Sequence, residues 1–221
     1  AGLALKMEEV RSYLIIILVS ITVITINIVH MYESIGRAVT DASFQVASII
    51  TTTGYSTVDF NMWPSLSKAI LVMLMFFGAC AGSTGGGLKV SRVIILTKTV
   101  KRELYRTLHP RRVKTVQMDK KAVSDAQRHS VSVYIAAFLL VFIVSFIIIS
   151  IDGFSFETNF TAVAATINNI GPGLDVVGPA GGFGGYSYLS KIVLIFDMLA
   201  GRLEILPMLI LINPSAWRRR S

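Results

Sequence analysis

Two short turns are the segments of this sequence whose residues could carry chemistry. The first reads TTTGYST at positions 51–57, and the second reads NNIGPGL at positions 168–174. Each has a glycine near its centre, which lets the backbone adopt angles closed to other residues and turn several carbonyl oxygens toward one side. A row of carbonyl oxygens can replace the water shell of a potassium ion. The simpler interpretations are a threonine-rich helix cap at 51–57 and an ordinary Gly-Pro-Gly turn at 168–174.

Each turn directly follows a short apolar segment, at 41–50 and at 159–167. Apolar runs of about 10–14 residues are too short to cross a bilayer and are typical of re-entrant segments. Irregular backbone is tolerated at membrane depth only where it is buried in protein or lines a water-filled cavity. The sequence therefore predicts two short pore helices, each followed by a turn that lines a polar path.

The elements that must hold these turns are long apolar helices. Apolar residues make up 53% of the 221 residues and charged residues 15%, whereas soluble domains average about 45–50% and about 25%. Stretches long enough to cross the roughly 30 Å hydrocarbon core are expected at 13–30, at 66–100 with a glycine-rich interruption, at 131–151 and at 188–212.

The charged residues predict an orientation in the membrane. Lys and Arg number 21 against 13 Asp and Glu, a net charge of +8. The basic residues gather in a linker at 101–130 and a tail at 213–221, as in cytoplasmic loops, rather than in the stripe expected of a nucleic-acid-binding surface. Both turns would then face outward, beneath an acidic mouth formed by Glu33, Asp41, Asp59, Asp152, Glu157 and Asp175.

The order helix, short helix, turn, helix occurs twice. Placing Gly54 on Gly171 aligns Val46 with Val163 and Ala47 with Ala164. Two repeats that start and end on the same side are related by an axis along the membrane normal and can enclose a pore. Because few residues are identical, two unrelated hairpins remain the alternative.

Four longer motifs give these features a family resemblance. They are TTTGYSTVDF at 51–60, GACAGSTGGGLKVSRV at 78–93, NFTAVAATINNIGPGL at 159–174 and MLAGRLEILPML at 198–209. Together they resemble the TrkH potassium-transport proteins of the Trk/Ktr/HKT superfamily. The resemblance implies an all-α membrane protein in which four helix–pore-loop–helix repeats surround one pore, with residues 1–100 as the third repeat and 131–212 as the fourth.

The resemblance also implies residue roles. The expected potassium filter consists of carbonyl oxygens from Thr52, Thr53, Gly54, Asn169, Ile170 and Gly171. The expected gate beneath it consists of Gly82, Ser83, Thr84, Gly85, Gly86 and Gly87, together with Arg202. The alternatives are close helix packing for the glycine run, and for Arg202 an internal ion pair with Glu204 or Asp197. The glycine run is not a phosphate-binding loop, because Leu88 separates it from Lys89 and no strand is expected before it.

The function expected from these features is potassium uptake across a bacterial inner membrane. No cofactor and no enzymatic activity are expected, because no nucleophile has a placed base and the single cysteine and three histidines have no metal-ligand spacing. The expected partners are the first two repeats of the same pore, a second copy in a homodimer, a cytosolic nucleotide-binding subunit of the TrkA type, and the lipid bilayer. A half-length protein that dimerises, a sodium-coupled or sodium-conducting relative, and a non-transporting scaffold remain alternatives.

Overall fold

The computed structural model describes residues 6–83, 85–109, 115–203 and 205–212. In these ranges the chain is all-α apart from two pairs of two-residue strands, as the sequence led us to expect. The expected tail at 213–221 lies outside the described residues, as do Thr84 and Glu204.

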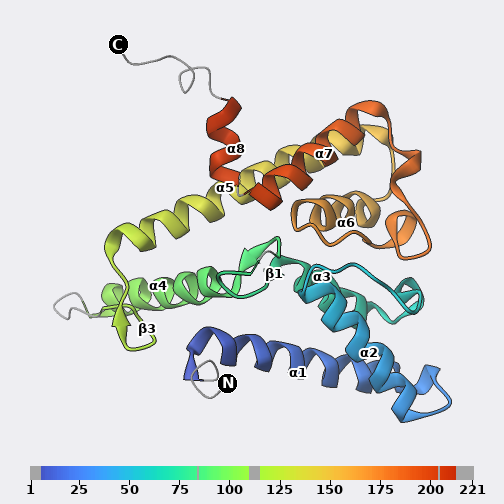
Figure 1. The fold of residues 1–221 in the computed structure, drawn as a ribbon, viewed down its shortest axis with the longest axis horizontal. Helices are drawn as coiled ribbons and strands as arrows, with labels where there is room; N and C mark the ends of the chain where they lie inside the picture. Colours follow the sequence, from blue (N-terminus) through green and yellow to red (C-terminus); the bar gives the residue numbers. More distant parts are fainter. Residues whose placement is uncertain (1–5, 84, 110–114, 204, 213–221) are drawn as a thin grey trace.

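The first half is a unit of three helices, α1, α2 and α3, which pack on one another (Figure 1). Helix α2 begins before the expected 41–50 segment because the side chain of Ser34 accepts a hydrogen bond from the backbone N–H of Arg37 and caps the helix there. The bounds are Glu8–Ile28 for α1, Ile35–Ile50 for α2 and Ser65–Phe76 for α3.

The second half repeats this arrangement with α5, α6 and α7, which also pack on one another. Ser124 and Gln127 form a capping box that starts α5 inside the expected basic linker rather than at 131, and Ser155 caps α6 ahead of the expected 159–167 segment. The bounds are Asp125–Ile149 for α5, Phe156–Ile167 for α6, Tyr188–Leu203 for α7 and Ile205–Ile212 for α8.

The expected 66–100 helix is interrupted, and α4 extends it past residue 100 into the basic segment. After α3, strands β1 (Phe77–Gly78) and β2 (Leu88–Lys89) pair in parallel, and α4 (Val90–Leu108) follows. Strands β3 (Gln117–Met118) and β4 (Lys121–Ala122) then form a small antiparallel hairpin before α5. Short 3-10 helices lie at Val29–Met31, Phe60–Met62, Ser150–Asp152, Asp175–Val177 and Phe183–Gly185.

The two units lie side by side with the same orientation. Figure 1 shows α1 and α5 running in the same direction, with their connections to α2 and α6 at the same end of the molecule. A cluster of aromatic rings joins the units where α3 packs on α6: the ring of Phe76 lies 5.6 Å from that of Phe142 and 6.2 Å from that of Phe160. Such ring pairs stabilise beyond their buried area by about 0.5–1.5 kcal/mol each.

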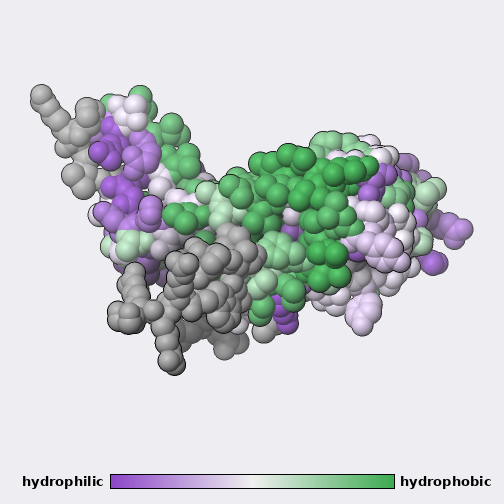
Figure 2. All heavy atoms as spheres, turned by 90° about the horizontal axis from the view of Figure 1, so that it is seen from above, coloured by the Kyte–Doolittle hydropathy of each residue, from purple (hydrophilic) through white to green (hydrophobic). Residues whose placement is uncertain are grey.

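Much of the outer surface is apolar. By length and composition two of the described helical segments, Glu8–Met31 and Asp125–Asp152, could cross a membrane. Helices α5 and α7 expose large aliphatic side chains, among them Leu140, Ile147 and Ile192. Figure 2 shows the hydrophobic residues gathered across the middle of one face, with hydrophilic residues toward both ends. This distribution fits a protein whose long axis crosses a lipid layer.

Candidate functional site

The two turns have the same unusual backbone. Thr52 and Asn169, which is 117 positions later in the sequence, have φ angles of 56° and 55°. Two residues further on, Gly54 and Gly171 have φ angles of 78° and 115°. A β-branched residue such as threonine rarely adopts a positive φ, because its side chain meets the backbone. The same strained position in both turns indicates a repeated structure rather than two unrelated helix caps.

The hydrogen bonds of the two turns match as well. In each turn, backbone N–H groups fold back on carbonyl oxygens in the last turn of the preceding helix. The matching pairs are Thr52 N to Ile49 O and Asn169 N to Thr166 O, both 3.0 Å, and Thr53 N to Ser48 O at 2.9 Å and Ile170 N to Ala165 O at 2.8 Å.

This folding leaves a set of carbonyl oxygens without protein donors. In the described part of the chain, none of the six expected filter residues accepts a hydrogen bond at its carbonyl oxygen. Thr53 and Gly171 are exposed, whereas the other four residues are buried or half-buried, where carbonyl groups are normally paired. The unpaired oxygens are thus available to water or a cation. The six are Thr52, Thr53, Gly54, Asn169, Ile170 and Gly171.

The two turns touch each other through one of the glycines. A methyl group placed on Gly54 would lie 1.9 Å from the carbonyl oxygen of Ile170 and 3.4 Å from Cδ of Pro172. Only glycine allows this approach. Gly171 occupies the equivalent position in the second turn, yet nothing lies within 4 Å of its corresponding methyl position. The contact therefore covers one side of the first turn and leaves the same side of the second turn open.

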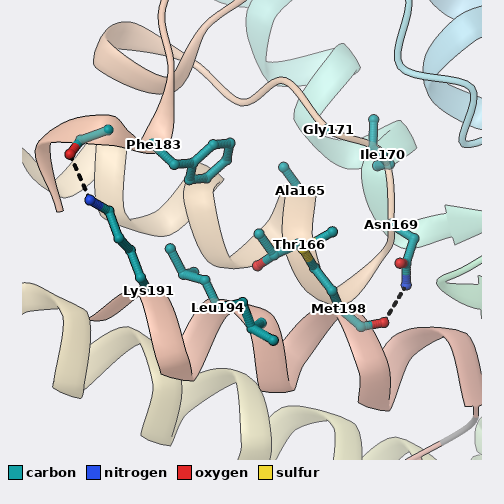
Figure 3. A pocket seen from close by; sticks show the side chains of 11 residues that line it. Ala165, Thr166, Asn169, Ile170, Gly171, Phe183, Lys191, Leu194 and Met198 are labelled. Atoms are coloured by element: carbon teal, nitrogen blue, oxygen red, sulfur yellow. Dashed lines mark hydrogen bonds between the residues drawn. The ribbon is translucent and has the colours of Figure 1, made fainter. Parts of the chain in front are cut away.

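The open side of the second turn is a hollow of about 520 Å³ between α6, the turn and α7. Figure 3 shows Leu194 and Met198 of α7 facing Thr166 of α6 across it. At one end Lys191 turns away and donates to the carbonyl oxygen of Gly184 at 2.8 Å. The walls are thus largely apolar.

Helix α7 fixes the second turn from behind. The side-chain amide of Asn169 donates to the carbonyl oxygen of Met198 at 3.1 Å (Figure 3). A methyl group on Gly201 would lie 1.9 Å from the carbonyl oxygen of Ile167, so α7 approaches α6 at a distance that admits only glycine. Sequence reasoning did not identify Gly201 as a packing residue, although a glycine inside an apolar helix is a known signal for close approach.

The glycine-rich segment lies directly against both turns. Phe77–Gly78 and Leu88–Lys89 pair and close the loop between them. A methyl group on Gly86 would come within 2.3 Å of the carbonyl oxygen of Asn168, and one on Gly85 within 3.3 Å of Thr52 Oγ1. A methyl group on Gly87 would come within 3.0 Å of Asn168 Oδ1. The structure thus brings the expected filter and most of the expected gate together.

Within that loop, the expected gate residues have different surroundings. Ser83 Oγ accepts a hydrogen bond from the backbone N–H of Gly85 at 3.2 Å, and its carbonyl oxygen accepts one from Lys89 Nζ at 2.7 Å. Gly82 has a φ of 89° and no atom within 4 Å of its methyl position.

Arg202 has an exposed side chain near the end of α7, directly after Gly201. Its alternative partner Asp197 is completely buried and accepts a hydrogen bond from Ser145 Oγ at 2.7 Å. The second oxygen of Asp197 has no hydrogen-bond partner. The structure therefore gives no support to an Arg202–Asp197 ion pair, while the alternative with Glu204 falls outside the described residues.

Two carboxylates of the expected acidic mouth, Asp175 and Glu157, bind other protein groups. Asp175 Oδ2 accepts hydrogen bonds from Thr158 Oγ1 at 2.6 Å and Ser155 Oγ at 2.7 Å, which lower the pKa of that carboxyl. Glu157 forms an ion pair with Lys68 of the first unit at 3.0 Å. Two carboxylates of the expected acidic mouth are therefore paired or hydrogen-bonded within the protein, which reduces its free negative charge.

Comparisons with known proteins identify relatives of this chain. The family model TrkH, described as a cation transport protein, matches residues 8–219. The Trk system potassium uptake protein TrkH of Salmonella typhimurium is 40% identical over 189 residues, which are 86% of this chain and 39% of that protein. The TrkH of Vibrio parahaemolyticus is 43% identical over the same share of each chain.

A solved structure is also similar. The crystal structure of the potassium transporter TrkH from Vibrio parahaemolyticus superposes with a TM-score of 0.87 at 39% identity, covering 97% of this chain and 46% of that one. The chain thus spans about two fifths of the length of the curated relatives it matches.

Proposed function

Because the chain belongs to the TrkH family of cation transport proteins, we propose that it supplies two of four repeats around a pore that takes up potassium across a bacterial inner membrane. The observation that carries this proposal is the pair of equivalent turns in contact, with six carbonyl oxygens that accept no hydrogen bond from the described residues. Such oxygens can replace the hydration shell of potassium without a fixed negative charge that would hold the ion too tightly.

The proposed pore needs two further repeats. The first turn has a neighbouring turn packed on Gly54, whereas the corresponding side of Gly171 is open beside an apolar hollow. An interface that joins unlike surfaces closes into a ring only when further units continue it. The first two repeats of the same pore would fill the open side, and a second copy of this chain is the alternative occupant.

The loop at 82–87 would serve as the gate. It lies against both turns at Thr52 and Asn168, so an ion that leaves the carbonyl oxygens meets it next. Arg202 would stand on the same path and oppose the free passage of cations through its positive charge.

The rest of the proposal follows from the family. The relatives are cation transporters and not enzymes, and no cofactor is needed if the membrane potential drives uptake, at about 2.3 kcal/mol per charge per 100 mV. The name "Trk system" of the relatives indicates a transport system with several components. A TrkA-type nucleotide-binding subunit on the basic cytoplasmic segment and a homodimer in the bilayer would complete the assembly.

The test is growth in limiting potassium of uptake-deficient cells that express the full polypeptide containing this chain. We expect Gly54→Ser and Gly171→Ser to weaken rescue or the selectivity for potassium over sodium. Gly36→Ser is the matched control, because no atom lies within 4 Å of its methyl position. Rescue that tolerates both filter substitutions, in protein shown to reach the membrane, would favour a scaffold and refute the filter.

A further inference from the structure

Glu9, in the first turn of α1, has a carboxylate that is buried and bonded to two separate segments. Its side chain is 3% exposed. One oxygen, Oε1, accepts a hydrogen bond from the backbone N–H of Ala81 at 2.7 Å and another from that of Ser91 at 3.1 Å. Ala81 directly precedes the glycine-rich loop, and Ser91 lies in the first turn of α4. One oxygen atom thus joins α1, the loop and α4.

The bond to Ser91 compensates for a missing cap. The first N–H groups of a helix have no partner inside the helix, and Lys89, at the N-cap of α4, provides no side-chain acceptor. The Glu9 carboxylate supplies one from another helix. It also lies near the positive N-terminal ends of both α1 and α4, which favour a negative charge. These interactions compensate for the burial of the charge.

The hydrogen bond from the backbone N–H of Ala81 to Glu9 connects the loop to α1. The loop closes on itself through the paired strands Phe77–Gly78 and Leu88–Lys89 and through the hydrogen bond from Lys89 Nζ to Ser83 O. Those contacts fix its shape. Glu9 instead fixes the beginning of the loop to a helix outside it, and so limits how far the loop can move from the two turns.

We propose that Glu9 is the positioning residue that holds the glycine-rich loop against the filter turns. Only the description of the loop as a gate rests on the proposed function; the anchoring itself does not. Loss of the charge-assisted hydrogen bond to Ala81 shifts a two-state equilibrium by about tenfold or more. The loop would then leave the turns more often.

The first test uses the full polypeptide in potassium-loaded liposomes, with equal amounts of inserted protein. Glu9→Ala is expected to raise basal potassium flux about tenfold without changing selectivity for potassium over sodium, because the turns are untouched. Glu9→Gln keeps a hydrogen-bond acceptor but loses the charge, so its basal flux should lie between those of wild type and Glu9→Ala. Glu8→Ala is the matched control: Glu8 is adjacent, but its carboxylate binds Lys98 Nζ at 2.7 Å and not the loop.

The second test does not depend on transport. Cys80, the only cysteine of this chain, precedes Ala81, and the mobility of a spin label attached there reports the freedom of the loop once other cysteines of the full polypeptide are replaced. The label should be more mobile in Glu9→Ala and Glu9→Gln than in the labelled wild type or Glu8→Ala. Wild-type mobility of the label in Glu9→Gln would overturn the anchor even if Glu9→Ala fails to insert. Greater mobility with no potassium flux in any variant would keep the anchor and refute the proposed function.

Discussion

Asn61 and Asp175 exchange two hydrogen bonds between the repeats. The side-chain amide of Asn61 donates to the carbonyl oxygen of Asp175 at 3.1 Å, and the backbone N–H of Asp175 donates to Asn61 Oδ1 at 2.8 Å. A methyl group on Gly178 would overlap the same amide, at 2.0 Å. One side chain of the first unit is therefore embedded in the backbone of the second, just outside the turns.

The first prediction concerns this amide. Asn61→Ala should lower the stability of the full protein in detergent by about 1–2 kcal/mol. Two hydrogen bonds are lost and the backbone N–H of Asp175 loses its partner, while the carbonyl oxygen of Asp175 keeps the bond from Gly178 N. Thermal unfolding measures the loss. Met62→Ala is the control, since Met62 is adjacent but 73% exposed. Equal unfolding temperatures for the two variants would contradict the role of Asn61.

The second prediction compares glycines. Gly54→Ala should abolish or strongly reduce potassium uptake, because its methyl group would lie 1.9 Å from the carbonyl oxygen of Ile170. Gly36→Ala should leave uptake unchanged and stabilise α2 by up to about 1 kcal/mol, as alanine does at an open helical position. Uptake assays at matched expression test both. Normal uptake by Gly54→Ala would show that the two turns are not in contact in the working pore.

The third prediction separates two roles of Asn169. Asn169→Gly removes the hydrogen bond to Met198 and tolerates the φ of 55°, whereas Asn169→Ala removes the same bond and must also adopt that angle. The alanine variant should therefore be less stable than the glycine variant by about 1 kcal/mol. Unfolding in detergent measures the difference, and a glycine variant no more stable than the alanine one would argue against the strained turn.

The fourth prediction concerns pH. The hydroxyl groups of Thr158 and Ser155 lower the pKa of Asp175 in the folded protein. The contribution of Asp175 to stability is then present above its unfolded pKa of about 3.9 and is lost as pH falls through the lower folded value. Asp175→Asn should unfold at a lower temperature than wild type at pH 7, and the two should converge below about pH 4. A gap between wild type and Asp175→Asn that stays constant to pH 3 would exclude this carboxyl as the cause.

Local sequence signals predicted which segments form helices better than they predicted the residues at which those helices begin and end. The apolar runs predicted the long helices, but Ser34, Ser124 and Ser155 start α2, α5 and α6 earlier than hydrophobicity alone suggests. These helix starts can be predicted from the sequence, because each has a serine directly before the helical segment. The end of α4 at Leu108 was missed because its last turns carry charges that resemble a linker.

Residues of the candidate site could be identified from the sequence where they form a motif within one short segment. The glycines at 54 and 171 and the 82–87 run are local patterns. Glu9 and Asn61 have no such pattern, because their partners, Ala81 and Asp175, are far away in the sequence. A glutamate in the first turn of a helix is ordinarily explained by the helix dipole alone, and nothing nearby indicates that its carboxylate reaches a loop.

The one-sided contact at Gly54 has a consequence for assembly. The second repeat places Ile170 against Gly54 of the first, while the equivalent position at Gly171 has no neighbour among the described residues. Units that repeat this contact would join in one rotational sense only. A chain of such units stops growing only when the last meets the first. If the proposed four-repeat pore assembles through this contact, an excess of this chain would compete for the same receiving surfaces, and incomplete rings would accumulate at the expense of closed ones.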